Sequence, residues 1–88
     1  ALTFSLSQNY PNPFNPTTKI NFSIPESGLV QLKVYNLLGE VITILVNEEK
    51  QAGKHEVQFN ASNLSSGIYL YTLRAGNYVD TYKMLLLR

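Results

Sequence analysis

The sequence has 88 residues, a length that accommodates one small domain but not a catalytic domain with a separate substrate domain. Only 15% of the residues are charged, 7 basic and 6 acidic, for a net charge of +1. This balance argues against a nucleic-acid partner, which requires clustered lysine and arginine. Cysteine is absent, which excludes disulfides, thiolate metal sites and thiol catalysis.

The apolar segments of the chain are short. The longest, 41–46 and 84–87, fall far below the about 20 residues of a membrane-spanning helix, so we expect no membrane span. No basic and apolar leader precedes Ala1, so we expect a fragment of a longer protein, with any signal peptide outside it.

The composition favours β-structure, since Val, Ile, Thr, Tyr and Phe total 27 residues and alanine only 4. At the N-terminus, Leu2, Phe4 and Leu6 alternate with polar residues, which predicts a short strand. The proline-rich motif over 9–16 holds three prolines, each of which removes an N–H donor. It predicts an ordered extended loop or edge crossing.

Two alternating segments follow, 17–24 and 29–36, each with apolar side chains on one face. The segment 25–28 between them predicts a hairpin turn, and Gly39 can supply a positive φ after the second strand. Residues 41–46 are nearly all apolar, as in a strand covered on both faces, or on one face by an external partner.

A polar loop over 47–53 leads to a predicted strand at 55–59, and a second loop precedes a predicted hairpin of 68–75 and 78–87. Seven short strands without a helix or a repeat predict an all-β fold. We expect a seven-stranded antiparallel Ig-like β-sandwich that forms a single domain over residues 1–88.

One local pattern supports the sandwich. Residues 64–69 have the layout of a tyrosine corner, in which a tyrosine entering a strand returns its hydroxyl to backbone a few residues upstream. We therefore predict a hydrogen bond from the Tyr69 hydroxyl near Ser65.

Candidate chemistry is sparse, and we predict no catalytic residue, no metal site and no cofactor. His55, the only histidine, is predicted to be a packing or hydrogen-bonded residue on the inward face. The charge cluster 48–50 is predicted to be a solvated turn rather than an acid–base pair. Tyr35, Tyr78 and Tyr82 are expected to be exposed, as sheet-forming side chains or, in a less favoured interpretation, as a platform for sugars.

Several segments together form a specific pattern. They are Asn9-Tyr10-Pro11-Asn12-Pro13-Phe14-Asn15-Pro16, Val34-Tyr35-Asn36-Leu37-Leu38-Gly39-Glu40-Val41, Leu64-Ser65-Ser66-Gly67-Ile68-Tyr69, and the closing Lys83-Met84 with Arg88. This pattern resembles the type A C-terminal sorting domain of the type IX secretion system, the Por secretion system family. The matched motif positions are Tyr10, Pro11, Asn12, Pro13, Phe14, Gly39, Gly67 and Tyr69.

The resemblance implies a sorting signal, not an enzyme, carried by a secreted or cell-surface protein of Bacteroidetes-type bacteria. A passenger domain would precede it and cross the inner membrane by a separate signal. The outer-membrane translocon would then recognise the folded domain, and a sortase-like peptidase would remove it for surface attachment or release. The implied location is the periplasm in transit, then the outer membrane, the cell surface or the medium.

The family's recognition determinants lie towards the C-terminal strand, which implies translocon recognition by Lys83, Met84, Leu85, Leu86, Leu87 and Arg88. An unpaired strand edge can add a partner strand, so we expect this edge, its out-facing apolar residues and Arg88 to dock on the translocon. Exposed edges also predict a possible dimer by strand addition. We expect the prolines to keep the passenger junction extended and accessible to the peptidase, with Tyr10 and Phe14 as its anchors.

Two other classes of function stay open at this point. One is a structural or carbohydrate-binding β-sandwich appended to an exported enzyme, and the other, least favoured, is an enzyme. An Ig-like module of flagellar hook-capping proteins is similar in outline, so the fold alone does not decide the function.

Overall fold

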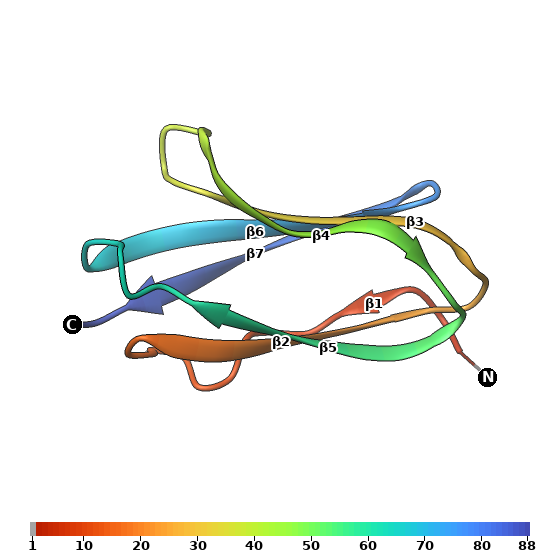
Figure 1. Cartoon of the computed structure of the whole chain (residues 1–88), viewed down its shortest axis with the longest axis horizontal. Coiled ribbons are helices and arrows are strands. Elements are labelled where there is room, and N and C mark those ends of the chain that lie inside the picture. The colour runs from red at the N-terminus through yellow and green to blue at the C-terminus, as the bar shows by residue number, and fades with distance from the viewer. Residues whose placement is uncertain (1) are drawn as a thin grey trace.

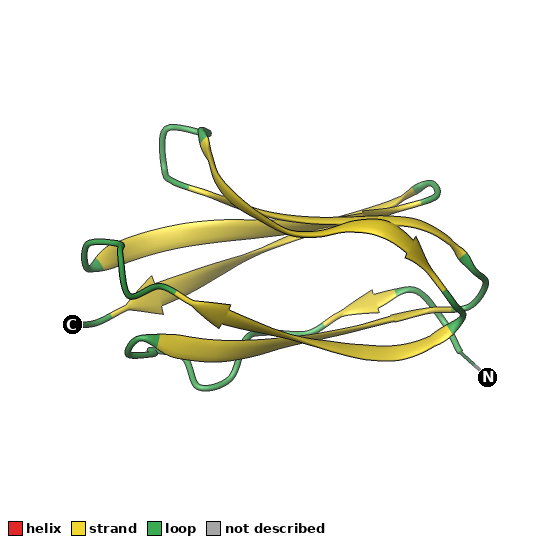
Figure 2. Cartoon of the chain, in the orientation of Figure 1, coloured by secondary structure: helices red, strands yellow, loops and turns green. Residues whose placement is uncertain are grey.

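The computed structural model describes residues 2–88, in which seven strands form two sheets that pack face to face (Figure 1). The strands are β1 (Ser5–Leu6), β2 (Thr17–Ile24), β3 (Gly28–Tyr35), β4 (Val41–Lys50), β5 (Gly53–Asn60), β6 (Gly67–Ala75) and β7 (Tyr78–Leu86). Figure 2 shows only strands and loops over the described residues. The sheet orders are β1-β2-β5 and β4-β3-β6-β7, and each pair of these strands is antiparallel. The predicted seven-stranded Ig-like β-sandwich is confirmed.

The core consists of the alternating apolar side chains of the strands, which meet between the two sheets. In β2, β3 and β6 the side chains that alternation groups on one face are buried. These positions are Ile20, Phe22, Ile24, Val30, Leu32, Val34, Tyr69, Tyr71 and Leu73. Period-2 patterning therefore grouped the side chains of these strands correctly, and for β3 it also identified the core face.

The first strand is shorter than the one predicted over residues 2–6. Ser5 pairs with Ser23 near the end of β2, and Pro25 follows two residues later without an N–H to donate. The ladder ends at this pair, and the segment before it is held by the Ser23 hydroxyl, which donates to the Thr3 carbonyl at 2.6 Å. Phe4 instead packs against the core and stacks on Tyr78, with ring centroids 5.3 Å apart.

The turn between β2 and β3 is not the predicted hairpin, because the two strands lie in different sheets. Both edges of β2 are occupied, by β1 and β5, so the chain crosses to the opposite sheet after Pro25. The hairpin predicted for 68–75 and 78–87 is confirmed, since β6 and β7 pair along their whole length around Gly76-Asn77.

The fourth strand extends further than predicted. Residues 47–50, expected in a loop, pair with 28–31 of β3 and continue β4 to Lys50. β4 is an edge strand, and charged residues are well tolerated at such positions because their side chains reach water. The predicted loop is therefore reduced to the two residues between β4 and β5.

The apolar run 41–46 is not covered on both faces. Two register shifts against β3 insert extra residues into β4, and Ile42 and Leu45 pack against the core. Val41 and Ile44 point outward and are 50% and 51% exposed. Of the two predicted arrangements, coverage on both faces is wrong, and one face of this run lies open.

Candidate recognition site

The C-terminal strand β7 buries one face and presents the other. Met84 and Leu86 are 1% and 0% exposed, within the core, whereas Leu87 is 49% exposed and Leu85 is half-buried. β7 also lies at the edge of its sheet. The face predicted for recognition is therefore available, and it consists of the side chains of Lys83, Leu85 and Leu87.

The edge of β7 is not open, in contrast to the expectation for residues 83–87. The backbone N–H of Phe14 donates to the Leu85 carbonyl and the N–H of Leu87 donates to the Phe14 carbonyl, both at 3.0 Å. The Leu85 N–H donates to Asn12 Oδ1, also at 3.0 Å. The proline-rich segment thus occupies the hydrogen-bonding edge that strand addition would need.

Arg88 is bound within the domain rather than free for a partner. Its guanidinium donates to the carbonyl oxygens of Ala61, Ser62 and Leu64 at 3.4, 2.5 and 2.6 Å, and its backbone N–H donates to Ser66 Oγ at 3.0 Å. All three bonds come from Nη1, whose two N–H groups are shared among the three carbonyls of this loop. The side chain of Arg88 therefore holds the loop between β5 and β6, and this favours a structural role over the expected docking on the translocon.

A buried polar network holds the start of the proline-rich segment. The Tyr71 hydroxyl donates to the Ser7 carbonyl at 2.6 Å and accepts from the Asn9 backbone N–H at 2.8 Å. The Asn9 side-chain amide donates to Thr18 Oγ1 at 3.0 Å and to the Pro11 carbonyl at 3.1 Å. Because burial disfavours the charged form, it raises the pKa of Tyr71 to about 12.

Gln8 connects this network to the last strand. Its side-chain amide donates to Asn9 Oδ1 at 2.7 Å and to the Lys83 carbonyl at 2.6 Å. Sequence reasoning missed the roles of Gln8, Asn9 and Tyr71. The signal available was Tyr71 itself, an inward tyrosine whose hydroxyl needs a partner.

The two aromatic residues of the proline motif behave differently. Phe14 is 2% exposed and its ring lies 6.0 Å from that of Phe59, so its predicted anchoring role is confirmed. The prediction for the Tyr10 side chain is wrong, because it is 80% exposed. Tyr10 is held only through its backbone, which exchanges hydrogen bonds of 2.9 and 3.0 Å with Lys19.

The tyrosine corner is confirmed. The Tyr69 hydroxyl donates to the Ser65 carbonyl at 2.7 Å. Gly67, the motif glycine just before it, has φ 151°, a conformation that side chains rarely adopt. The matched segment 64–69 therefore has a structural role at the start of β6.

The loop between β3 and β4 is closed by the side chain of Asn36. Asn36 Oδ1 accepts from the N–H groups of Leu38 and Glu40 at 2.9 and 3.0 Å, and its amide donates to Glu40 Oε1 at 2.7 Å. Gly39 has the predicted positive φ, 84°, and its N–H donates to the Asn36 carbonyl. Leu37 and Leu38 are 66% and 84% exposed at the tip, which rises away from the three-stranded sheet (Figure 1).

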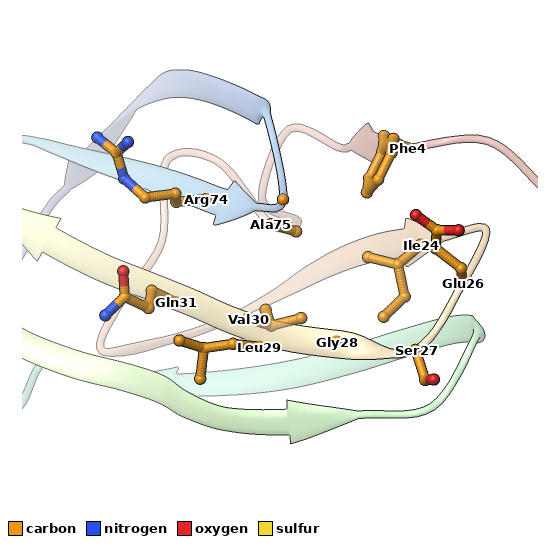
Figure 3. Close-up of a pocket in the computed structure, with 11 residues that line it drawn as sticks. Phe4, Ile24, Glu26, Ser27, Gly28, Leu29, Val30, Gln31, Arg74 and Ala75 are labelled. Atoms are coloured by element: carbon orange, nitrogen blue, oxygen red, sulfur yellow. The ribbon is translucent and has the colours of Figure 1, made fainter.

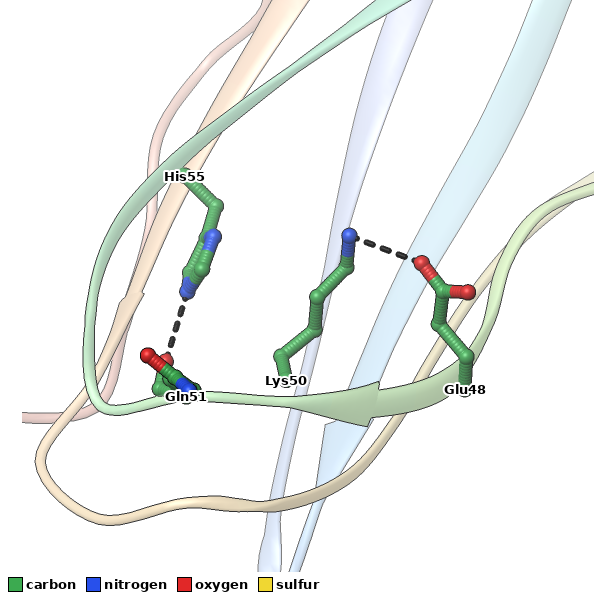
Figure 4. Close-up of polar contacts among 4 residues, drawn as sticks. All are labelled: Glu48, Lys50, Gln51 and His55. Atoms are coloured by element: carbon green, nitrogen blue, oxygen red, sulfur yellow. Dashed lines mark hydrogen bonds and ion pairs between the residues drawn. The ribbon is translucent and has the colours of Figure 1, made fainter.

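His55 is a packing and hydrogen-bonded residue, as predicted. Its ring stacks on Phe22 with centroids 5.2 Å apart, and Nε2 lies 2.8 Å from the Gln51 carbonyl (Figure 4). Nearby, Lys50 donates to Glu48 at 2.8 Å, and this hydrogen bond and charge lower the pKa of the Glu48 carboxyl. The pair is solvated as predicted, although it lies on β4 rather than in a turn.

The groove drawn in Figure 3 lies where β2 and β6 end and β3 begins. Ile24, Val30 and Ala75 line its apolar part, and the charged groups of Glu26 and Arg74 lie towards opposite ends. Its polar side chains do not converge on one point, so this groove lacks the polar arrangement of a ligand site.

The three tyrosines expected to be exposed are only half-exposed. Tyr78 stacks on Phe4, and the ring of Tyr82 lies 5.9 Å from that of the buried Tyr71. Tyr35 lies on the outer face of β3, apart from both. The three rings therefore form no common platform for a sugar.

Residues 2–88 contain no group of three or more His, Asp and Glu side chains placed to hold a metal ion. Among the helices and strands described, no helix has the length and apolar character needed to cross a membrane.

Comparison with known proteins places these features in a family. A structure titled as that of PorZ, an essential bacterial surface component of the type IX secretion system of Porphyromonas gingivalis, matches with a TM-score of 0.60 and 15% identity. The match covers 97% of this chain and 11% of that one, and at this identity it supports the fold. A search of curated proteins gives no match. The family model described as "Secretion system C-terminal sorting domain" matches residues 8–87, and the chain therefore belongs to this family of sorting domains.

Proposed function

We propose that this domain is the sorting signal that takes an upstream passenger across the outer membrane through the type IX secretion system. The match of the sorting-domain family to residues 8–87 carries this proposal, since it covers nearly the whole chain. The family is defined by sorting, not by catalysis. In this proposal residues 1–88 form one domain, the translocon recognises it, and a sortase-like peptidase removes it. The passenger then reaches the cell surface or the medium.

The proposed recognition by residues 83–88 divides into two parts. Lys83, Leu85 and Leu87 turn their side chains outward and would contact the translocon. Met84 and Leu86 would act from the core by holding the strand in place. Because the proline-rich segment occupies the β7 edge, recognition would use the outward side chains rather than strand addition. For the same reason we do not propose that the domain dimerises by adding a strand of a second copy to the β7 edge.

A fusion experiment tests the sorting function. The 88 residues are placed after a reporter that carries its own inner-membrane signal, in a type IX host and in the same host without a working translocon. We expect surface delivery only in the first host. A reporter that stays in the periplasm of both would reject the proposal.

Point substitutions test the recognition residues better than truncation, because deleting 84–88 also removes Met84 and Leu86 from the core. The triple variant Lys83→Ser, Leu85→Ser, Leu87→Ser should reduce delivery. Val79→Ser is the matched control, since Val79 lies outward on the same strand and is 48% exposed. Equal delivery by the triple variant and the control would exclude a role for residues 83–87.

A further inference from the structure

We infer that the 36–40 loop and the adjoining end of the outer face of the four-stranded sheet form a docking surface for a protein whose apolar cleft is bordered by carboxylates. This inference rests on the proposed function, because it names the kind of partner that the exported domain meets. It adds a second contact region to the C-terminal strand.

The first observation is the construction of the loop. Asn36 bonds to Leu38, Gly39 and Glu40, so five hydrogen bonds that each have one partner in Asn36 close the loop. Leu37 and Leu38 make no part of the core and are 66% and 84% exposed. A loop that is fixed while its two largest apolar side chains point into water is preorganised for contact, because little side-chain and backbone freedom is lost on binding.

The second observation is that the apolar surface continues across the sheet. One row of the outer face runs from Val41 through Tyr35 and Leu70 to Lys83, as the strand registers show. Beside Val41, Ile44 is 51% exposed. An exposed apolar patch of this kind, continuous over several strands, marks interaction sites in soluble proteins.

The third observation is charge. The row Val41-Tyr35-Leu70-Lys83 and the next row, Ile44-Lys33-Thr72-Thr81, include two lysines and no acidic side chain. The one carboxylate of the adjoining loop, that of Glu40, accepts a hydrogen bond from the Asn36 amide at 2.7 Å. The ion pairs within residues 2–88 use Lys19 and Lys50 instead. Two copies of this face would bring lysines against lysines, which opposes self-association, whereas a partner with carboxylates around an apolar cleft complements both features.

The fusion assay with loop variants tests the docking surface. Leu37→Ser/Leu38→Ser should lower surface delivery about tenfold, as expected when two anchors of an interface are lost. The matched control is Leu29→Ser, because Leu29 lies outward on β3 at the opposite end of the same face and is 52% exposed. Leu37→Met/Leu38→Met should keep delivery, and the unfolding midpoint should match the wild type in all three variants.

The charge component is tested by Lys33→Glu, which should lower delivery, with Lys33→Arg as its control. Delivery by Leu37→Ser/Leu38→Ser at the wild-type level would overturn the docking surface and leave the sorting function intact. Equal losses in Leu37→Ser/Leu38→Ser and Leu29→Ser would also overturn it. A wild-type fusion that fails to reach the surface would instead reject the sorting function, and this inference with it.

Sedimentation of the isolated chain distinguishes a separate partner protein from a second copy of this chain as the occupant of the docking surface. We expect a monomer at micromolar concentrations. A dimer that Leu37→Ser/Leu38→Ser dissociates would mean that a second copy covers the face, and would overturn the acidic partner.

Discussion

Phe14 pairs with Leu86 through a parallel backbone bridge, although the two residues come from opposite ends of the chain. The pairing makes the proline-rich segment an irregular neighbour of β7 and buries both side chains in one core. Two motifs that are distant in the sequence, one at the proposed passenger junction and one at the proposed recognition strand, therefore form a single piece of structure.

Phe14→Ala should lower the free energy of unfolding by about 3–5 kcal/mol, because it leaves a cavity beside Phe59 and loosens the segment that covers the β7 edge. Denaturant unfolding measures the change. Tyr10→Ala is the control from the same motif, and since Tyr10 is 80% exposed its change should stay within about 0.5 kcal/mol. A larger loss for Tyr10 than for Phe14 would contradict the anchoring described for this segment.

Tyr71→Phe should cost about 1–3 kcal/mol of unfolding free energy, because it leaves the Ser7 carbonyl and the Asn9 N–H without their buried partner. Tyr82→Phe is a suitable control: among the described residues its hydroxyl makes no hydrogen bond to protein, and its ring stacks on Tyr71. Hydrogen exchange should show faster exchange of the Asn9 amide in Tyr71→Phe. Unchanged exchange at Asn9 would count against the network.

Alkaline pH should lower the free energy of unfolding because the Tyr71 hydroxyl ionises. The pKa of Tyr71 rises from 10.0 to about 12 on folding, because burial disfavours the phenolate. A tyrosine whose pKa is raised in the folded state stabilises the fold fully below the pKa of the unfolded state, here pH 10. This contribution is lost as the pH rises to about 12, and the free energy of unfolding then falls by roughly 3 kcal/mol. Burial and Asp80 also raise the pKa of Tyr78, so Tyr71→Phe should reduce this loss without abolishing it. A pH series of urea unfolding curves provides the comparison.

Most of the strands were predictable because they follow one physical rule, the alternation of apolar and polar side chains on a half-buried surface. This rule placed Val30, Leu32 and Val34 in the core correctly. It failed where pairing rather than pattern decides the outcome. Pro25 predicts a turn, but it does not show whether the next strand pairs with β2 or crosses to the other sheet. The two bulges of β4 turn Ile42 and Leu45 inward, and no residue of the sequence indicates a bulge there.

The sequence predicted where the candidate site lies in the chain, but not which of its side chains are exposed. Residues 83–88 could be selected from the family motif, but their division into inward and outward side chains depends on the β6–β7 register. The closed edge was missed because three prolines give no ladder signal, although Phe14 still contributes one N–H and one carbonyl to β7. Gly39 predicted a turn, but not the exposed leucines that the turn presents.

Tyr69→Phe tests the tyrosine corner. Loss of the 2.7 Å hydrogen bond to the Ser65 carbonyl should lower the unfolding free energy by about 1–3 kcal/mol. The isosteric change keeps the ring in the core, so the expected loss is that of the hydroxyl alone. Thermal unfolding of Tyr69→Phe beside Tyr35→Phe, whose ring lies on the outer face, measures it. Equal midpoints for the two variants would contradict a structural role for the corner.

Arg88→Met separates a structural role for the last side chain from a recognition role. Removing the guanidinium leaves the carbonyls of Ala61, Ser62 and Leu64 without their charged donor, so backbone amides of the 61–66 loop should exchange faster. The global cost should be about 1 kcal/mol, because these hydrogen bonds are largely solvent-exposed. Delivery of a fused reporter should stay near the wild-type level, since the side chain faces its own loop. A large loss of delivery with unchanged exchange in the loop would show that Arg88 contacts the partner directly.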